Sequence, residues 1–232
     1  MALLLPPDDA GLDFANVEGG LVQAAFRGKP RRTWQNVSNV AFLEGAGASS
    51  YWHMATHGWF DWDDVRASGV FVDRNGAMLT LGDLLEAREQ LGSPRLVVLS
   101  ACSTGIAEVG RNPEEFSGLP SGLIMAGAAG VVASLWPVDD LSTTLLMSRF
   151  YELHLGQRQM PAEALRYAQI WLKQATIADL RNYANAKRTD GSLTAEQFSV
   201  LAETLEPAGP SGLAEIPFSA PRFWGAFVIY GE

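Results

Sequence analysis

Two residues of this sequence have the chemistry of a thiol acyl-transfer site, and each follows a short apolar run. His57 comes directly after the run Tyr51–Thr56, and Cys102 comes directly after Arg95–Ala101. In such a reaction the imidazole removes the thiol proton, the thiolate attacks a carbonyl carbon, and the imidazole then protonates the leaving amine. The glycines that follow each residue let backbone N–H groups approach a substrate closely and point at a developing oxyanion.

The residue types alone leave commoner structural roles open. A single cysteine at the end of an apolar strand is more often a small buried core residue than a nucleophile. A histidine at a strand end is likewise more often structural than catalytic. Because the two residues stand at two strand ends, a catalytic pair and a structural pair are about equally good interpretations at this point.

Other reactive residues give weaker patterns. Ser121 lies in Gly118–Gly122, which does not match the GxSxG elbow of serine hydrolases. His53 precedes His57 by four positions, but the segment is expected to be a strand and lacks the glutamate of the HExxH zinc motif. We therefore expect His53 to be a core residue and the protein to need no metal or organic cofactor.

The elements that must hold the pair are predicted from apolar runs, capping residues and turns. Strands are predicted at 51–56, 95–101, 130–135 and 225–230. Helices are predicted at 12–26, 33–44, 80–90, 119–128, 141–154, 161–174 and 194–205. Thr80 with Asp83 and Thr194 with Gln197 form capping boxes, and Asn-Gly at 75–76 marks a hairpin within 69–80.

Strands and helices alternate along the chain, and the strands are continuously rather than alternately apolar. This pattern is typical of the α/β class, with a mostly parallel central sheet and helices on both faces. Functional groups collect beyond the carboxyl ends of the strands in such sheets. We predict a single domain over residues 1–232, with a peripheral and more polar insertion at about 175–217.

Composition narrows the classes of partner and compartment. The net charge of −9 argues against direct binding of nucleic acid or of an anionic membrane, because both are themselves negative. One cysteine cannot form an internal disulfide, and Met1–Leu5 lacks the basic residues of a signal peptide. The longest apolar stretch, Gly122–Trp136, is too short and too rich in glycine to span a bilayer. We therefore expect a cytoplasmic protein.

Three segments together resemble the CHAT domain family: Tyr51–Gly58 (YWHMATHG), Val97–Gly105 (VVLSACSTG) and Val131–Asp140 (VVASLWPVDD). They occur in the family's order with fitting spacings, and the closing segment Phe223–Tyr230 (FWGAFVIY) also fits. The family belongs to the caspase-like cysteine peptidase clan and is related to separase. The resemblance covers roughly residues 33–174 and 221–230, and it implies a caspase-like three-layer α/β sandwich.

The resemblance also implies an activity and its residues. Cys102 corresponds to the nucleophile and His57 to the acid/base partner of a cysteine endopeptidase that hydrolyses protein or peptide substrates. The backbone N–H groups of Gly58 and Cys102 correspond to an oxyanion hole. Ser103 stands where caspases carry an arginine after the cysteine, so we expect no aspartate specificity before the scissile bond.

A further segment corresponds to substrate binding in the family. Trp136, Asp139 and Asp140 lie where relatives border the pocket for the residue before the scissile bond, and an acidic group there would favour Lys or Arg. The plainer role for the two aspartates is to cap the helix that begins near Ser142.

Family members often carry TPR or other sensor repeats and stay latent until a partner orders their loops. This sequence contains no such repeat, so the signal would come from a separate sensor protein or from a TPR-type region of a longer chain. We expect the loop Ser103–Ser117 to respond to it. The alternative is a non-catalytic caspase-like interaction module, although the presence of both His57 and Cys102 argues against lost activity.

Overall fold

The structure, a computed structural model, describes residues 1–7, 11–61, 63–100 and 118–231 of the chain. The chain forms two compact units. The first comprises Met1–Leu12, Gly28–Val138 and Ala226–Glu232, and the second comprises Asp13–Arg27 and Asp139–Gly225. Each unit is therefore assembled from segments that lie far apart in the sequence.

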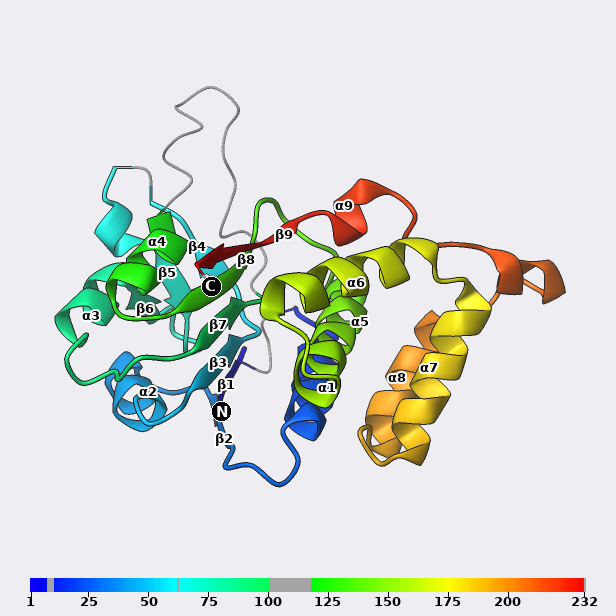
Figure 1. The fold of residues 1–232 in the computed structure, drawn as a ribbon, viewed down its shortest axis with the longest axis horizontal. Helices are drawn as coiled ribbons and strands as arrows, with labels where there is room; N and C mark the ends of the chain where they lie inside the picture. Colours follow the sequence, from blue (N-terminus) through cyan, green and yellow to red (C-terminus); the bar gives the residue numbers. More distant parts are fainter. Residues whose placement is uncertain (8–10, 62, 101–117, 232) are drawn as a thin grey trace. The chain divides into compact units, whose positions relative to one another are not determined.

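The first unit contains a six-stranded sheet in the order β2-β1-β3-β7-β8-β9 (Figure 1). The neighbours are parallel to one another, except that β9 runs antiparallel to β8. This arrangement confirms the predicted α/β fold with a mostly parallel central sheet. The strands are β1 (Ala2–Leu5), β2 (Arg32–Gln35), β3 (Tyr51–Met54), β7 (Leu96–Leu99), β8 (Gly130–Ser134) and β9 (Phe227–Gly231).

Side chains on both faces of the central strands are buried, which explains the continuous apolar runs in the sequence. One face contributes residues such as Trp52 and Val97 to a hydrophobic cluster with residues of α2 (Asn39–Ala46), α3 (Leu81–Glu86) and α4 (Gly118–Met125). Residues that alternate with them along the strands are fully buried as well: Leu3, His53, Val98 and Val132.

A second, three-stranded sheet in the first unit follows β3. It consists of β4 (Gly58–Trp59), β5 (Gly69–Phe71) and β6 (Met78–Thr80), and β5 and β6 form the predicted antiparallel hairpin. Gly76 in its turn has a φ of 86°, the left-handed conformation that glycine adopts without a steric penalty. A short 3-10 helix, Val65–Ala67, lies between β4 and β5.

The second unit contains helices and no strand among the residues that the structure describes. α6 and α8 are amphipathic, and the predicted capping box at Thr194 and proline at the first position of α6 are both present. The elements are α1 (Ala15–Ala25), α5 (Asp140–Tyr151) with a π-helical turn at Glu152–Gly156, α6 (Pro161–Gln174), α7 (Ile177–Thr189), α8 (Ala195–Thr204), a 3-10 helix at Pro210–Ala214, and α9 (Pro221–Trp224).

Residues 33–44, predicted as one helix, form most of β2 and then α2, so this prediction is wrong. Ser38 caps α2, and its hydroxyl accepts a hydrogen bond from the Ala41 N–H at 3.2 Å. Asn36 precedes the cap with a φ of 53°, a left-handed conformation that ends the strand. The pairing of β2 with β1 overrides the helical spacing of the apolar residues in this segment.

β1 and α7 are among the elements that were not predicted. β1 has only four residues, and it is a strand because it pairs with both β2 and β3. α7 begins with a capping box between Thr176 and Asp179, which was the available signal in the sequence. The segment 175–217, expected to be a peripheral insertion, contributes α7, α8 and a 3-10 helix to the second unit. The single-domain organisation stays a prediction.

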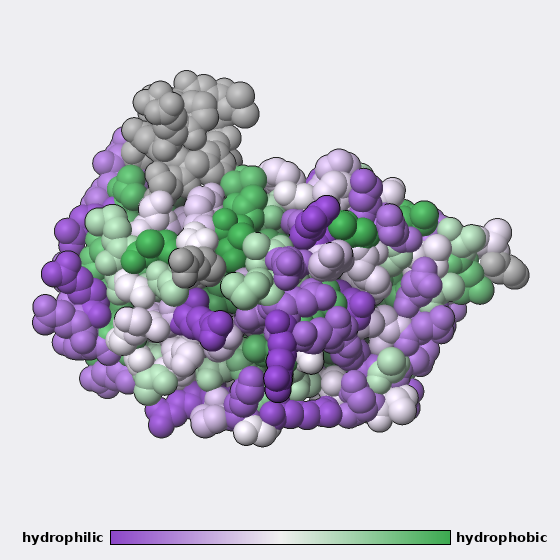
Figure 2. Space-filling view, in the orientation of Figure 1, coloured by the Kyte–Doolittle hydropathy of each residue, from purple (hydrophilic) through white to green (hydrophobic). Residues whose placement is uncertain are grey.

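Hydrophilic residues occupy most of the face shown in Figure 2, with smaller hydrophobic patches between them. Single exposed apolar residues such as Met125 and Trp59 are ordinary features of protein surfaces. Among the described residues, no helix has both the length and the apolar character needed to cross a membrane.

Candidate active site

The chain between β3 and β4 holds His57 at the carboxyl end of the central sheet. Its backbone carbonyl accepts a hydrogen bond from the Phe71 N–H at 2.9 Å. The buried Thr56 hydroxyl donates to the Phe71 carbonyl, also at 2.9 Å. Both bonds attach this segment to β5, so the backbone that carries the imidazole is fixed, whereas the side chain itself is only partly buried.

The register of β3 and β7 relates the position of His57 to that of Cys102. These strands are parallel neighbours, and Met54 pairs with Leu99 at their carboxyl ends. His57 and Cys102 each follow the last paired residue by three positions in the sequence. Cys102 itself lies outside the described residues, as does the loop Ser103–Ser117, so the predicted dyad and the predicted response of that loop stay predictions.

The ladder between β4 and β5 directs the Gly58 amide away from β5. Gly58 is the ladder partner of Val70, while the neighbouring carbonyl of His57 accepts the Phe71 N–H. In an antiparallel ladder, successive residues point their N–H and C=O groups alternately toward and away from the partner strand. β4 is an edge strand, so the buried Gly58 points its N–H out of this sheet. An oxyanion donor needs such an orientation.

A cleft of about 310 Å³ lies beside His57 in the first unit. The Asn-Gly turn predicted the hairpin that forms one wall of the cleft, but no pattern in the sequence indicated that this wall would face His57. The pairing of β4 with β5 creates that proximity, and it adds an aromatic side chain and a cation to the cleft. The lining residues are Pro7, Thr56, His57, Phe71, Asp73, Arg74 and Gly76.

The three residues predicted to border the substrate pocket have distinct positions. Trp136 follows β8 in the first unit and is partly buried. Asp139 is the N-cap of α5 in the second unit, and its carboxylate accepts the Ser142 N–H at 2.8 Å. Asp140 is the first residue of α5 and accepts the Phe14 N–H at 2.8 Å. The capping role is thus present for Asp139, and substrate binding by all three residues stays a prediction.

Asp140 has an unusual proton affinity for an aspartate. Its pKa is raised from 3.8 to about 6, mainly because the carboxyl group is partly buried. The hydrogen bond from Phe14 opposes this rise, and the nearby carboxylates of Glu18, Asp139 and Asp13 contribute to it. The folded protein therefore holds a proton on Asp140 at a pH at which the unfolded chain has released it. Ionisation of Asp140 above this pKa destabilises the folded state.

We expect Asp140→Asn to raise the free energy of unfolding at pH 8 by roughly 1 kcal/mol. The effect is smaller than the pKa shift alone would give, because solvent screens the partly exposed carboxylate. Asparagine keeps an acceptor for the Phe14 N–H and removes the charge. The gain is expected to shrink as the pH falls from 6 toward 3.8 and to vanish below about pH 3, where both states carry the proton. Thermal unfolding of the two proteins across this pH range measures it, and equal stabilities at pH 8 would contradict the assignment.

The other two histidines of the chain are His53 and His154. His53 is fully buried in β3, as expected for a core residue. His154 lies in the π-helical turn of the second unit, and its Nδ1 is 2.7 Å from the Gln159 carbonyl oxygen. Among the residues that the structure describes, no three His, Cys, Asp or Glu side chains are grouped to hold a metal ion.

Comparison with known families adds an independent observation. The model of the CHAT domain family matches residues 11–232 of the chain. The matched range contains segments of both compact units and includes His57, Gly58 and Cys102. No curated protein matches the chain.

Proposed function

Because this chain belongs to the CHAT domain family, which is related to the caspase-like cysteine peptidases, we propose that it is a cysteine endopeptidase with a Cys102–His57 dyad. The observation that carries this proposal is the register of β3 and β7. The two strands are hydrogen-bonded neighbours, and each candidate residue follows its strand by the same number of positions. Neighbouring strands lie about 4.8 Å apart, so their continuations leave the same edge of the sheet side by side.

The reaction proceeds in two stages. His57 removes the thiol proton of Cys102, and the thiolate attacks the carbonyl carbon of the scissile bond to form a tetrahedral oxyanion. The oxyanion collapses to a thioester while the imidazolium gives its proton to the leaving amine. Water then loses a proton to His57 and attacks the thioester, which releases the carboxylic acid product and restores the thiol.

Backbone groups stabilise the oxyanion in this scheme. The outward orientation of the Gly58 N–H in the edge strand β4 supports its role as one donor, and the N–H of Cys102 is the second. Trp136, Asp139 and Asp140 contact the residue before the scissile bond. The enzyme stays latent until a separate sensor protein, or a TPR-type region of a longer chain, activates it.

Cleavage of a mixed peptide library by the wild-type chain and by Cys102→Ala tests the proposal. We expect wild type to cut peptides and the alanine variant to cut none, because the nucleophile forms the covalent intermediate. Cleavage by both proteins would assign the activity to another group or to a contaminant. If neither cuts, the alkylation rate of Cys102 at neutral pH decides: fast alkylation indicates a latent enzyme, and slow alkylation indicates a non-catalytic interaction module.

A further inference from the structure

The cleft beside His57 contains one cation, Arg74, that forms no ion pair with any other residue that the structure describes. The side chain of Arg74 is exposed at the rim of the cleft, and among the described residues no carboxylate forms a salt bridge with it. A guanidinium offers five N–H donors in a plane and binds a carboxylate through two of them at once. The cleft therefore has an anion-binding group a short way from the histidine.

The neighbouring carboxylate does not neutralise this cation by direct contact. Asp73 Oδ1 accepts the backbone N–H groups of Asn75 at 2.9 Å and of Ala77 at 2.8 Å, and Oδ2 accepts the Asn75 amide at 3.4 Å. These bonds turn the carboxylate of Asp73 into the hairpin turn. The guanidinium of Arg74 remains the group that can donate hydrogen bonds to a ligand.

The backbone of Arg74 is held in place from two sides. Its N–H donates to Asn36 Oδ1 at 3.1 Å, and the adjacent Val37 N–H donates to the Val72 carbonyl at 3.0 Å. The turn itself is closed by Asp73. A rim that is already ordered loses little entropy when a ligand binds, so Arg74 is a suitable recognition group.

The position of the cleft indicates which part of a substrate it holds. In the proposed reaction His57 gives its proton to the leaving amine, which belongs to the residue after the scissile bond. The substrate chain after that bond must therefore pass on the side of the imidazole. His57 and Phe71 line the cleft together with Arg74, so this chain enters the cleft and reaches the guanidinium.

We propose that this cleft is the subsite for the first two residues after the scissile bond, and that Arg74 selects an acidic side chain there. The proposal rests on the proposed peptidase function. The net charge of −9 repels acidic peptides from the protein as a whole, so such a preference needs a local cation. The preference concerns the residues after the bond and is separate from any preference before it.

Binding of peptides to the Cys102→Ala variant tests the subsite without cleavage. Two peptides are compared that differ only in Asp or Asn at the second position after the scissile bond of the best library substrate. If none is cut, Asp and Asn are compared at each position in turn of one generic sequence. We expect about fivefold tighter binding of the Asp peptide, with a difference that shrinks in high salt. With Arg74→Glu added, the Asp peptide should bind more weakly than the Asn peptide.

Arg88→Glu is the matched control, because Arg88 is also exposed in the first unit and does not line the cleft. It changes the net charge equally and should leave the preference for Asp intact. The subsite proposal is contradicted if Cys102→Ala binds the two peptides equally well. It is also contradicted if both Arg74→Glu and Arg88→Glu abolish the preference for Asp. Cleavage by wild type with no preference for any residue after the scissile bond also contradicts the subsite proposal. It supports the peptidase function, so failure of one proposal can be distinguished from failure of the other.

Discussion

Replacing His57 by alanine is expected to lower kcat/KM for peptide cleavage by about a thousandfold or more. Two losses combine in this variant. An ordinary cysteine has a pKa near 8.5, so without the imidazole only about 3% of the thiol would be ionised at pH 7. The leaving amine also has no proton donor. Steady-state cleavage of a single fluorogenic peptide measures the effect.

The rate of Cys102 alkylation separates this role from a structural one. We expect the wild-type thiol to react with iodoacetamide at pH 6 about tenfold faster than the thiol of His57→Ala, because the imidazolium stabilises the thiolate. Thermal unfolding serves as the control, and His57 is only partly buried, so the midpoint should change little. Imidazole in the buffer should restore part of the activity. If His57→Ala lowers kcat/KM less than tenfold and leaves the alkylation rate of Cys102 unchanged, the dyad is contradicted.

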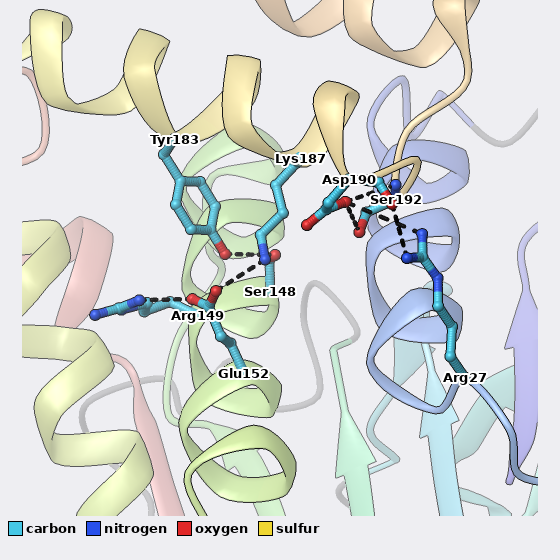
Figure 3. A network of polar contacts seen from close by, with 8 residues as sticks. All are labelled: Arg27, Ser148, Arg149, Glu152, Tyr183, Lys187, Asp190 and Ser192. Atoms are coloured by element: carbon cyan, nitrogen blue, oxygen red, sulfur yellow. Dashed lines mark hydrogen bonds and ion pairs between the residues drawn. The ribbon is translucent and has the colours of Figure 1, made fainter.

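Replacing Glu152 by alanine is expected to reduce the free energy of unfolding by about 2–3 kcal/mol. Glu152 lies in the π-helical turn after α5 and accepts hydrogen bonds from Lys187 at 2.9 Å and from Arg149 at 2.6 Å (Figure 3). The side chain of Lys187 is only 14% exposed. Its ammonium would be left inside the second unit without a carboxylate, and such a group is costly to bury. Urea unfolding at pH 7 measures the change.

The surrounding contacts explain why Lys187 cannot simply move into water. Its Nζ lies 5.1 Å from the centre of the Tyr183 ring, and the Tyr183 hydroxyl is 2.8 Å from that of Ser148 (Figure 3). Tyr183 packs in turn on Trp171, with ring centres 4.9 Å apart. Burial raises the pKa of Tyr183 well above its ordinary value, so its hydroxyl stays protonated in this network.

The matched control is Glu86→Ala, which removes a carboxylate from the exposed ion pair with Arg66 at 3.0 Å. We expect it to cost less than about 0.5 kcal/mol, because exposed pairs contribute little. Adding Lys187→Met to Glu152→Ala should recover part of the stability, since no unpaired cation then remains. Equal costs for Glu152→Ala and Glu86→Ala would show that the network in the second unit is not a source of stability.

The contribution of Glu152 to the free energy of unfolding should also depend on pH. It should decrease as the pH falls, whereas that of Asp140 decreases as the pH rises. Burial alone would raise the pKa of Glu152, but the hydrogen bonds from Lys187 and Arg149 outweigh it and hold the pKa below 4.5. The unfolded chain therefore takes up a proton first as the pH falls. The stability that Glu152 provides is present above about pH 4.5 and is lost as the pH falls through its folded-state pKa.

Much of the fold was predictable from local patterns. The strands β3, β7, β8 and β9 are short apolar runs because both faces of the sheet are buried, so their hydrophobicity is continuous. The capping boxes at Thr80 and Thr194 predicted helix starts because each satisfies backbone N–H groups within its own turn. The Asn-Gly turn predicted the β5–β6 hairpin for the same local reason.

The errors lie where partners distant in the sequence decide the structure. β1 and β2 are strands because they pair with each other and β1 pairs with β3, and no local pattern in four residues carries that information. The direction of β9 is another case. Its run was predicted as a strand, but only the path of the chain through the second unit makes it antiparallel to β8.

The same distinction holds for the candidate site. Sequence by itself determined the chemistry: a thiol and an imidazole after two apolar runs, each followed by glycine, because residue type sets which protons and electron pairs are available. Tertiary structure alone decided the neighbours, namely that β3 and β7 are adjacent in register and that the hairpin brings Arg74 to the cleft of His57. These contacts depend on backbone hydrogen bonds between segments far apart in the chain, which no local spacing of residues specifies.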